Sequence, residues 1–244
     1  ITVSGVTAAA SENIEGLVTM SAADRISFTS GASTFNSLLA RANQLIRVNA
    51  NVTTDTGGLT LNGDADGGGS GTNGITFSAN RTLSSAGELL LQGGDGGFVG
   101  AGGLTLNAAD GVRITENLTT SGPLTINSDT DANGGVTTVA LGSTVTTNSA
   151  LLSITGSDIA LEGSLNSGAG ETRIQRSSLG TIGLGNATGQ DMSISAAELQ
   201  RIIATGLTIG GDMTRRVVVN GVTAANVAAI AGDVALSALA DNGQ

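Results

Sequence analysis

The chain contains no cysteine, histidine, lysine, tryptophan or tyrosine, and its one proline is Pro123. The absence of cysteine excludes disulfides and thiolate metal sites. The absence of histidine removes the commonest general base and the usual zinc ligand. The close carboxylate pairs Asp64/Asp66 and Asp129/Asp131 lie in glycine-rich stretches without the aromatic platforms that bind sugar rings. We therefore expect no enzyme activity and no resident cofactor.

Charged and aromatic residues are also scarce, at 12% and 2%, and the net charge is −10. A chain this acidic repels nucleic acid phosphates, so we expect no nucleic acid partner. It has no apolar run of about 18 residues, so we expect no membrane insertion. It begins with Ile1 rather than methionine, which we interpret as processing or as a segment of something longer.

Aliphatic residues and glycine dominate what is present: hydrophobic residues make up 39% of the chain, and 38 residues are glycine. A motif recurs that reads [IV]-x-[VILF], then [VL]-x-[TS], then L-x-[LI]. Its alternation of apolar and polar residues predicts short β-strands. The shortest spacing between copies indicates a unit of about 20 residues. The copies start at Ile46, Ile75, Val112, Val139 and Ile159.

Short strands in a repeat of this size predict an all-β fold, a parallel β-helix (β-solenoid) that runs through residues 1–244 as one domain. Each coil is expected to bury its aliphatic positions and pair with its neighbours. The longer units gain their residues after the L-x-[LI] pair, which predicts insert loops at one corner of the coil. These inserts are 63–74, 93–103 and 128–135.

The stretch 33–48 fits two interpretations, because its apolar residues also have helical spacing. Its end starts a repeat whose other copies are rich in threonine and valine. We therefore favour strands over a helix. The positions expected to face inward are Leu38, Ala40, Ile46 and Val48.

Three segments carry helix signals, at 7–16, 195–206 and 223–232. In the second, Ser195 and Glu198 have capping-box spacing, Gly206 is a natural stop, and Leu199, Ile202 and Ile203 would share one helix face. In the third, Thr223 is the expected N-cap and Gly232 the expected C-cap. The alternative is an alanine-rich turn of the coil.

A second, longer repeat links the two ends of the chain. ITVSGVTAAASENIEGLVTMSA (1–22) aligns without a gap to VVVNGVTAANVAAIAGDVALSA (217–238), with ordered matches that include Gly5, Ile14 and Gly16. We interpret the two segments as equivalent parts of successive 216-residue repeats. Coils that stack without interruption, within one chain or head to tail between chains, form a fibre. The expected partner is therefore another copy of the repeat.

The runs NVTTDTGGLTLNGDA, DGVRITENLTTSGPLTINSDT and TIGLGNATGQDMSISAAELQRIIATGLTIGG resemble the shaft repeats of filamentous-haemagglutinin-like exoproteins of bacteria. The resemblance covers roughly residues 38–220. It implies a right-handed parallel β-helix and an extracellular or cell-surface location. The Asn-Pro motifs of that family's secretion domain are absent, so the resemblance extends to shaft material and supports no secretion route.

One short motif suggests a metal. Asp129, Asp131, Asn133 and Gly134 match the opening D-x-D-x-N-G of a calcium loop, whose oxygen ligands converge around a sharp turn. The acid expected at the twelfth position is replaced by Ala140. The alternative is that aspartate, asparagine and glycine are simply the residues that tight turns use.

Recurring polar residues suggest two further roles. Thr60, Thr105, Thr125 and Thr208 would point outward, as in a row of threonines that orders water at an ice surface, although threonine is also an ordinary outward residue of strands. Asparagines could stack their amides along the axis, and this structural role is favoured over glycosylation. The asparagines in equivalent positions are Asn51 with Asn117, and Asn62 with Asn107 and Asn127.

We therefore expect a structural segment of a giant repetitive bacterial protein that forms an extracellular fibre, matrix or adhesin shaft. The alternative is a discrete cell-surface domain that binds a glycan or a partner protein through the three insert loops.

Overall fold

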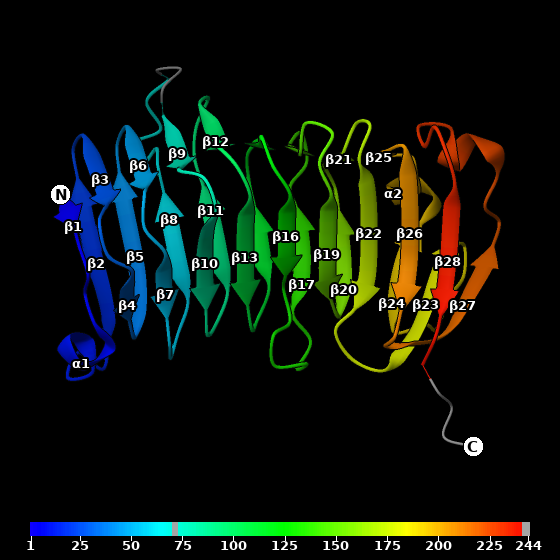
Figure 1. Cartoon of the computed structure of the whole chain (residues 1–244), viewed down its shortest axis with the longest axis horizontal. Helices are drawn as coiled ribbons and strands as arrows, with labels where there is room; N and C mark the ends of the chain where they lie inside the picture. The colour runs from blue at the N-terminus through cyan, green and yellow to red at the C-terminus, as the bar shows by residue number, and fades with distance from the viewer. Residues whose placement is uncertain (70–72, 241–244) are drawn as a thin grey trace.

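The structure, a computed structural model, describes residues 1–69 and 73–240. Its strands form an elongated stack with the N-terminus at one end and the C-terminal strands at the other (Figure 1). The strands of each sheet are parallel, and neighbours in the three long sheets are mostly three strands apart in chain order. This is the strand order of a parallel β-helix, so the predicted fold class is confirmed. Crossovers between parallel strands are nearly always right-handed, and the right hand of this β-helix stays a prediction.

The long sheets are named here A, B and C. Sheet A contains β1 (Thr2–Val3), β3 (Arg25–Phe28), β6 (Leu45–Val48), β9 (Gly74–Phe77), β12 (Gly97–Gly100), β15 (Leu118–Thr120), β18 (Thr144–Thr146), β21 (Ser164–Asn166) and β25 (Ile202–Ile203). Sheet B contains β2 (Leu17–Ala22), β5 (Ser37–Ala42), β8 (Leu59–Asn62), β11 (Leu89–Gln92), β14 (Val112–Ile114), β17 (Val136–Val139) and β20 (Asp158–Leu161). Sheet C contains β4 (Ser33–Phe35), β7 (Val52–Thr54), β10 (Arg81–Ser85), β13 (Leu104–Ala108), β16 (Leu124–Asn127), β19 (Leu152–Gly156), β22 (Glu171–Arg176), β26 (Gly206–Gly211) and β28 (Val234–Ala238).

A fourth sheet, D, continues the wall formed by sheet B. It contains β24 (Met192–Ser195), β23 (Gly180–Gly185) and β27 (Thr214–Asn220), in that spatial order. β24 lies against β20, the last strand of sheet B. The chain therefore leaves sheet C, passes over one layer to form β23, and returns to form β24 between β20 and β23. This reversal puts two strands of one turn on the same wall.

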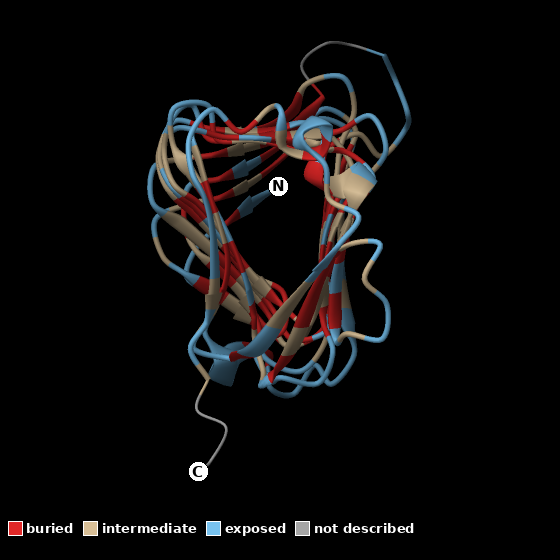
Figure 2. Ribbon diagram, turned by 90° about the vertical axis from the view of Figure 1, so that its right-hand side faces the viewer, coloured by how far each residue is buried: buried red, intermediate tan, exposed pale blue. Residues whose placement is uncertain are grey.

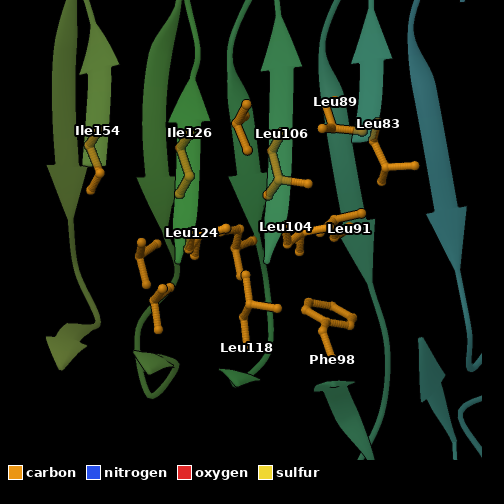
Figure 3. Packing of buried hydrophobic residues seen from close by; sticks show 14 of the residues in the cluster. Leu83, Leu89, Leu91, Phe98, Leu104, Leu106, Leu118, Leu124, Ile126 and Ile154 are labelled. Atoms are coloured by element: carbon orange, nitrogen blue, oxygen red, sulfur yellow. The ribbon is translucent and has the colours of Figure 1, made fainter. Parts of the chain in front are cut away.

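The core consists of aliphatic columns that run along the axis. In sheet C the register places each inward residue beside its equivalent in the next coil, so that equivalent side chains stack from layer to layer (Figure 3). Seen along the axis, the buried residues line the inner side of the walls (Figure 2). One fully buried column contains Leu83, Leu106, Ile126, Ile154, Ile174 and Ile209. Burying such side chains contributes about 1.5–3 kcal/mol each.

The predicted coil length and the strand interpretation of 33–48 are both confirmed. Phe98 pairs with Leu118, twenty positions later, and Val145 pairs with Leu165, again twenty positions later. Residues 33–48 form β4, β5 and β6 in place of a helix. The four positions expected to face inward, Leu38, Ala40, Ile46 and Val48, are all buried.

The insert loops lie at two corners, so the prediction of a single corner was wrong. The inserts that start at residues 63 and 93 follow β8 and β11 and lead from sheet B to sheet A. The insert 128–135 follows β16 and leads from sheet C to sheet B. Residues 70–72 of the first insert lie outside the described residues. Inserts are tolerated at both corners because each connects strands of different sheets and interrupts no ladder.

The prediction of a loop over 93–103 was also wrong, because Gly97–Gly100 form β12 between β9 and β15. Phe98 points into the core and is 1% exposed. The glycines around it conceal the strand pattern, and one of them allows a close approach. A Cβ atom at Gly97 would lie 2.7 Å from the Asn117 carbonyl oxygen, and Gly97 has a φ of +59°.

Each predicted helical segment contains one helical turn: α1 (Ala8–Ser11), α2 (Ala196–Leu199) and the 3-10 turn η1 (Ala224–Val227). The helix expected to continue to Gly206 ends at Leu199, and Ile202 and Ile203 form β25. Ile202 is buried and Ile203 is 42% exposed, so they alternate as in a strand and do not share a helix face. Among the described residues, no helix has the length and apolar character needed to cross a bilayer.

The recurring threonines and asparagines occupy outward positions of more than one sheet. Thr105 and Thr125 are register partners in sheet C, and Thr208 lies farther along the same sheet, but Thr60 lies in sheet B. Asn107 and Asn127 are likewise register partners, whereas Asn62 lies in sheet B. The predicted threonine row and asparagine ladder are thus each divided between two faces.

Candidate functional site: the repeated helical turn and the loop corners

Each helical turn follows a hydroxyl residue, and at α1 and α2 the hydroxyl oxygen accepts a hydrogen bond from a free N–H group of the turn. Thr7 Oγ1 accepts a hydrogen bond from Ala10 N at 3.2 Å. At α2, Ser195 Oγ accepts from Glu198 N at 3.2 Å while Glu198 Oε2 accepts from Ser195 N at 2.8 Å, which confirms the predicted capping box. At η1, Asn226 Oδ1 accepts from Thr223 N at 2.7 Å. Small polar residues therefore fix where each turn starts.

The α2 turn closes the end of sheet B. Glu198 Oε1 accepts a hydrogen bond from Leu161 N at 3.0 Å, and Arg201 Nη1 donates to Leu161 O at 2.6 Å. These two side chains replace the strand that would otherwise pair with β20 at Leu161. Nearby, Asp158 Oδ1 accepts from Ser193 N at 3.1 Å and so joins β20 to β24. Unpaired strand edges invite association with other chains, and these side chains satisfy this edge internally.

The carboxyl group of Asp158 is electrostatically unfavourable in this position. Burial raises the pKa of Asp158, and the neighbouring Glu198 charge acts in the same direction. The hydrogen bonds from Ser193 and Ile159 and the charge of Arg176 oppose the rise without cancelling it. The net pKa lies above the ordinary value, so Asp158 contributes more to stability when protonated.

Replacing Glu198 by alanine is expected to lower the free energy of unfolding by about 1–3 kcal/mol, because Leu161 N and Ser195 N would lose their acceptor. Chemical denaturation monitored by circular dichroism measures this. The matched control is Glu162→Ala, which removes an exposed carboxylate next to β20 and is expected to change stability by no more than about 0.5 kcal/mol. Equal effects of the two substitutions would contradict the role assigned to Glu198.

The two segments related by the long sequence repeat share their local structure. Both run from a strand through a glycine with positive φ, at Gly5 (61°) and Gly221 (65°), into a helical turn and then a strand. The turn ends with equivalent hydrogen bonds: Ile14 N donates to Ser11 O at 2.8 Å, and Ile230 N donates to Val227 O at 3.0 Å. We name this strand, turn and strand the repeated unit, residues 1–22 and 217–238. Its assignment to successive 216-residue repeats stays a prediction.

The predicted calcium ligands lie in the loop 128–135, but hydrogen bonds within the protein occupy the carboxylate oxygens of Asp129 and Asp131. Asp129 Oδ1 accepts from Gly134 N at 2.9 Å, and Asp129 Oδ2 accepts from Ser177 Oγ. Asp131 Oδ2 accepts from Asn133 Nδ2 at 2.9 Å. Asp129 is 3% exposed. This arrangement favours the alternative in which these residues organise a turn, and calcium binding at Asp129, Asp131 and Asn133 stays a prediction.

The loop 128–135 is also tied to the coils that follow it. Gly135 O accepts hydrogen bonds from Ser157 N and Ser157 Oγ, both at 2.9 Å. Arg176, which is buried, donates from Nη1 to Ser157 O at 2.9 Å and from Nε to Ser178 O at 3.1 Å. The contact between Asp129 and Ser177 spans 48 residues of sequence. The loop therefore clamps three successive layers of the C to B corner.

The pH dependence of stability is expected to report on Asp129. Burial raises the pKa of Asp129, but the hydrogen bonds from Ser177 and from the backbone of Gly134, Gly135 and Asn133 outweigh it, and the net pKa is lowered. A carboxyl group with a lowered pKa stabilises the folded state at pH values above its unfolded-state pKa, which is near 4. This stabilisation is lost as the pH falls through the pKa of the folded state.

Asp129→Asn is therefore expected to destabilise the protein by about 1–3 kcal/mol at pH 7, because asparagine supplies only one acceptor oxygen. The difference from the unsubstituted protein should persist above about pH 4, the unfolded-state value, and shrink as the pH falls below it and Asp129 itself becomes protonated. Urea denaturation at several pH values measures both. A difference that stays constant with pH would contradict the charge-dependent role.

Acidic residues also line the B to A corner. Burial raises the pKa of Glu116, and the charges of Asp95 and Asp64 on adjacent layers add to this rise. Asp64 Oδ1 accepts a hydrogen bond from Asn73 Nδ2 at 2.9 Å. Within residues 1–69 and 73–240, no group of three or more His, Cys, Asp or Glu residues is arranged to hold a metal ion. The acids of this corner therefore repel one another without assembling a metal site in the described part of the chain.

Comparison with known proteins gives no assignment. No family model matches the chain, no curated protein matches it, and no solved structure matches it.

Proposed function

We propose that this chain is a structural segment of a repetitive bacterial surface or secreted protein, in which β-helix coils stack into a fibre, matrix or adhesin shaft. The observation that carries the proposal is the repeated unit, which has the same strand, turn and strand structure at two positions 216 residues apart. A β-helix grows by adding coils to its end. A unit that recurs near both ends of the stack is what a continuous shaft requires.

The composition and core support a passive role. The interior is a single aliphatic cluster that runs from Val3 to Ile230, with few aromatic side chains. The strands of each layer pair only with strands of the layers next to it, so length can increase without any change in the cross-section. The family resemblance of the sequence is in keeping with an extracellular shaft, and the location is part of the proposal.

The second candidate is glycan or protein binding through three insert loops. The structure offers less loop surface for such binding than the sequence predicted. Residues 97–100 of the insert 93–103 form a core strand, and 128–135 is held against the neighbouring coils at a different corner from the other two inserts. Saturable glycan binding that disappears when residues 64–69 are shortened would favour this candidate over the shaft.

The shaft proposal is tested by the length of an extended chain. The test chain would join residues 1–238 to residues 23–244 of a second copy. Residues 217–238 then take the place of residues 1–22 of that copy. Small-angle X-ray scattering is expected to show a rigid rod whose maximum dimension grows by about 40–45 Å, from the 4.8 Å spacing of layers. Two particles joined by a flexible linker would contradict the proposal.

A further inference from the structure

The two copies of the repeated unit lie on different faces of the β-helix. In residues 1–22, β1 belongs to sheet A and β2 to sheet B. In residues 217–238, β27 belongs to sheet D, on the wall of sheet B, and β28 belongs to sheet C. Along the chain the faces follow one another in the order B, A, C. Each strand of the second copy thus lies one face earlier in this order than its equivalent in the first copy.

The winding of the chain between the copies gives the same result. From β1 to β25 the chain visits sheet A nine times, which is eight full turns. It then crosses sheet C at β26 and reaches the B wall at β27, which adds two thirds of a turn. The 216-residue period therefore contains eight and two-thirds turns, and its end does not return to the face on which it began.

The two copies show the two sides of one unit. In the second copy the unit contacts the coil before it: Ile230 bridges to Ala204 and is 8% exposed, and Val219 pairs with Leu184. In the first copy the unit contacts the coil after it: Thr2 pairs with Ser27, and Val3 pairs with Phe28. The first copy therefore shows the edge of the unit that pairs with the following coil, and the second copy shows the edge that pairs with the preceding coil.

We propose that successive 216-residue periods join with a rotation of one face, a third of a turn about the axis. The proposal rests on the proposed function, because it describes how one period continues into the next. The partner surface is formed by the outer edges of β27 and β28, and its occupant is the coil equivalent to residues 23–42 of the next period. The loop 128–135 of three consecutive periods then projects in three directions around the shaft.

Engineered disulfides in the extended chain test the rotation, and the absence of native cysteine makes the result unambiguous. Val218 is equivalent to Thr2, so the rotated join places Val218 beside Ser27 of the second copy, on the B wall. Neighbouring residues of a parallel ladder lie about 4.8 Å apart, within disulfide reach. The test chain carries Val218→Cys and, in the second copy, Ser27→Cys. Its matched control carries Ala231→Cys with the same second cysteine. A join without rotation would place the strand that contains Ser27 of the second copy on sheet A, beside Ile230 and Ala231.

Mass spectrometry after mild oxidation is expected to show an intramolecular disulfide in nearly all molecules of the first variant and in few molecules of the control. A disulfide in the control alone would overturn the rotation and leave the shaft in place. A rigid rod without either disulfide would also overturn the rotation. If scattering shows no rigid rod, the proposed function fails together with the rotation, so the two failures are distinguishable.

Discussion

Replacing Phe98 by alanine is expected to lower the free energy of unfolding by about 3–5 kcal/mol. Phe98 is 1% exposed and lies in the core beside Leu118, its partner in β15. Truncation removes the transfer free energy of the ring and leaves a cavity between two layers that cannot collapse without breaking ladder hydrogen bonds on both sides. The substitution therefore tests whether the glycine-rich segment 93–103 is a coil of the β-helix or a free loop.

Val99→Ala is the matched control, because Val99 lies on the same strand, faces outward and is 48% exposed. It is expected to change stability by no more than about 0.5 kcal/mol. Urea denaturation of both variants measures the contrast. Similar small effects of the two substitutions would show that β12 contributes little to the core and would restore the loop interpretation.

Replacing Gly135 by alanine is expected to cost about 3 kcal/mol or more, at the upper end for overpacking. A Cβ atom at Gly135 would lie 2.5 Å from Ala109 O and closer still to Ser128 O. Both neighbours are backbone atoms, one in the same loop and one in the preceding layer, so the clash cannot be relieved by rotating a side chain. The same shift would disturb the two hydrogen bonds that Ser157 donates to Gly135 O.

Gly16→Ala is the control for this substitution. Gly16 has no atom within 4 Å of a Cβ position and no positive φ, so alanine should leave stability unchanged or raise it by up to about 1 kcal/mol through the unfolded state. Thermal and urea denaturation compare the two. If Gly135→Ala were as stable as Gly16→Ala, the loop 128–135 would be free of the coils and available to a ligand, as the second candidate function requires.

Much of the fold could be predicted because alternation of apolar and polar residues reports directly which side chains face inward. Leu38, Ala40, Ile46 and Val48 were placed correctly on this basis. Hydroxyl residues before Ala-rich turns likewise located the starts of α1, α2 and η1. The facing of a strand and the start of a helical turn depend on neighbouring residues in the chain, so the sequence alone is sufficient to predict them.

The arrangement of the strands in space could not be predicted from the same signals. The apolar pair recurs on every face, so a copy can be aligned correctly in sequence and yet lie on another sheet. Val112 was aligned with Ile46, but β14 belongs to sheet B and β6 to sheet A. The reversed order of β23 and β24 has no local signal, and the glycines around Phe98 left β12 without a visible strand pattern.

In the candidate site, too, local features could be predicted and contacts between distant segments could not. The capping box of Ser195 and Glu198 was visible from spacing, but the contact of Glu198 with Leu161 N depends on which layers meet at the end of sheet B. The hydrogen bond between Asp129 and Ser177 joins loops two coils apart, which follow β16 and β22 of sheet C. Long-range contacts of this kind decide whether an acidic loop is a turn or a ligand site.

Electron cryo-microscopy of a chain with three consecutive periods tests the central claim most directly. We predict uninterrupted parallel ladders through each repeated unit and an advance of about 40–45 Å per period. We also predict that the short helix of the repeated unit is rotated by one face, one third of a full rotation, around the axis from each period to the next. Ladders that end at the repeated unit, with each period folded as a separate body, would contradict the account of this chain as a segment of a continuous shaft.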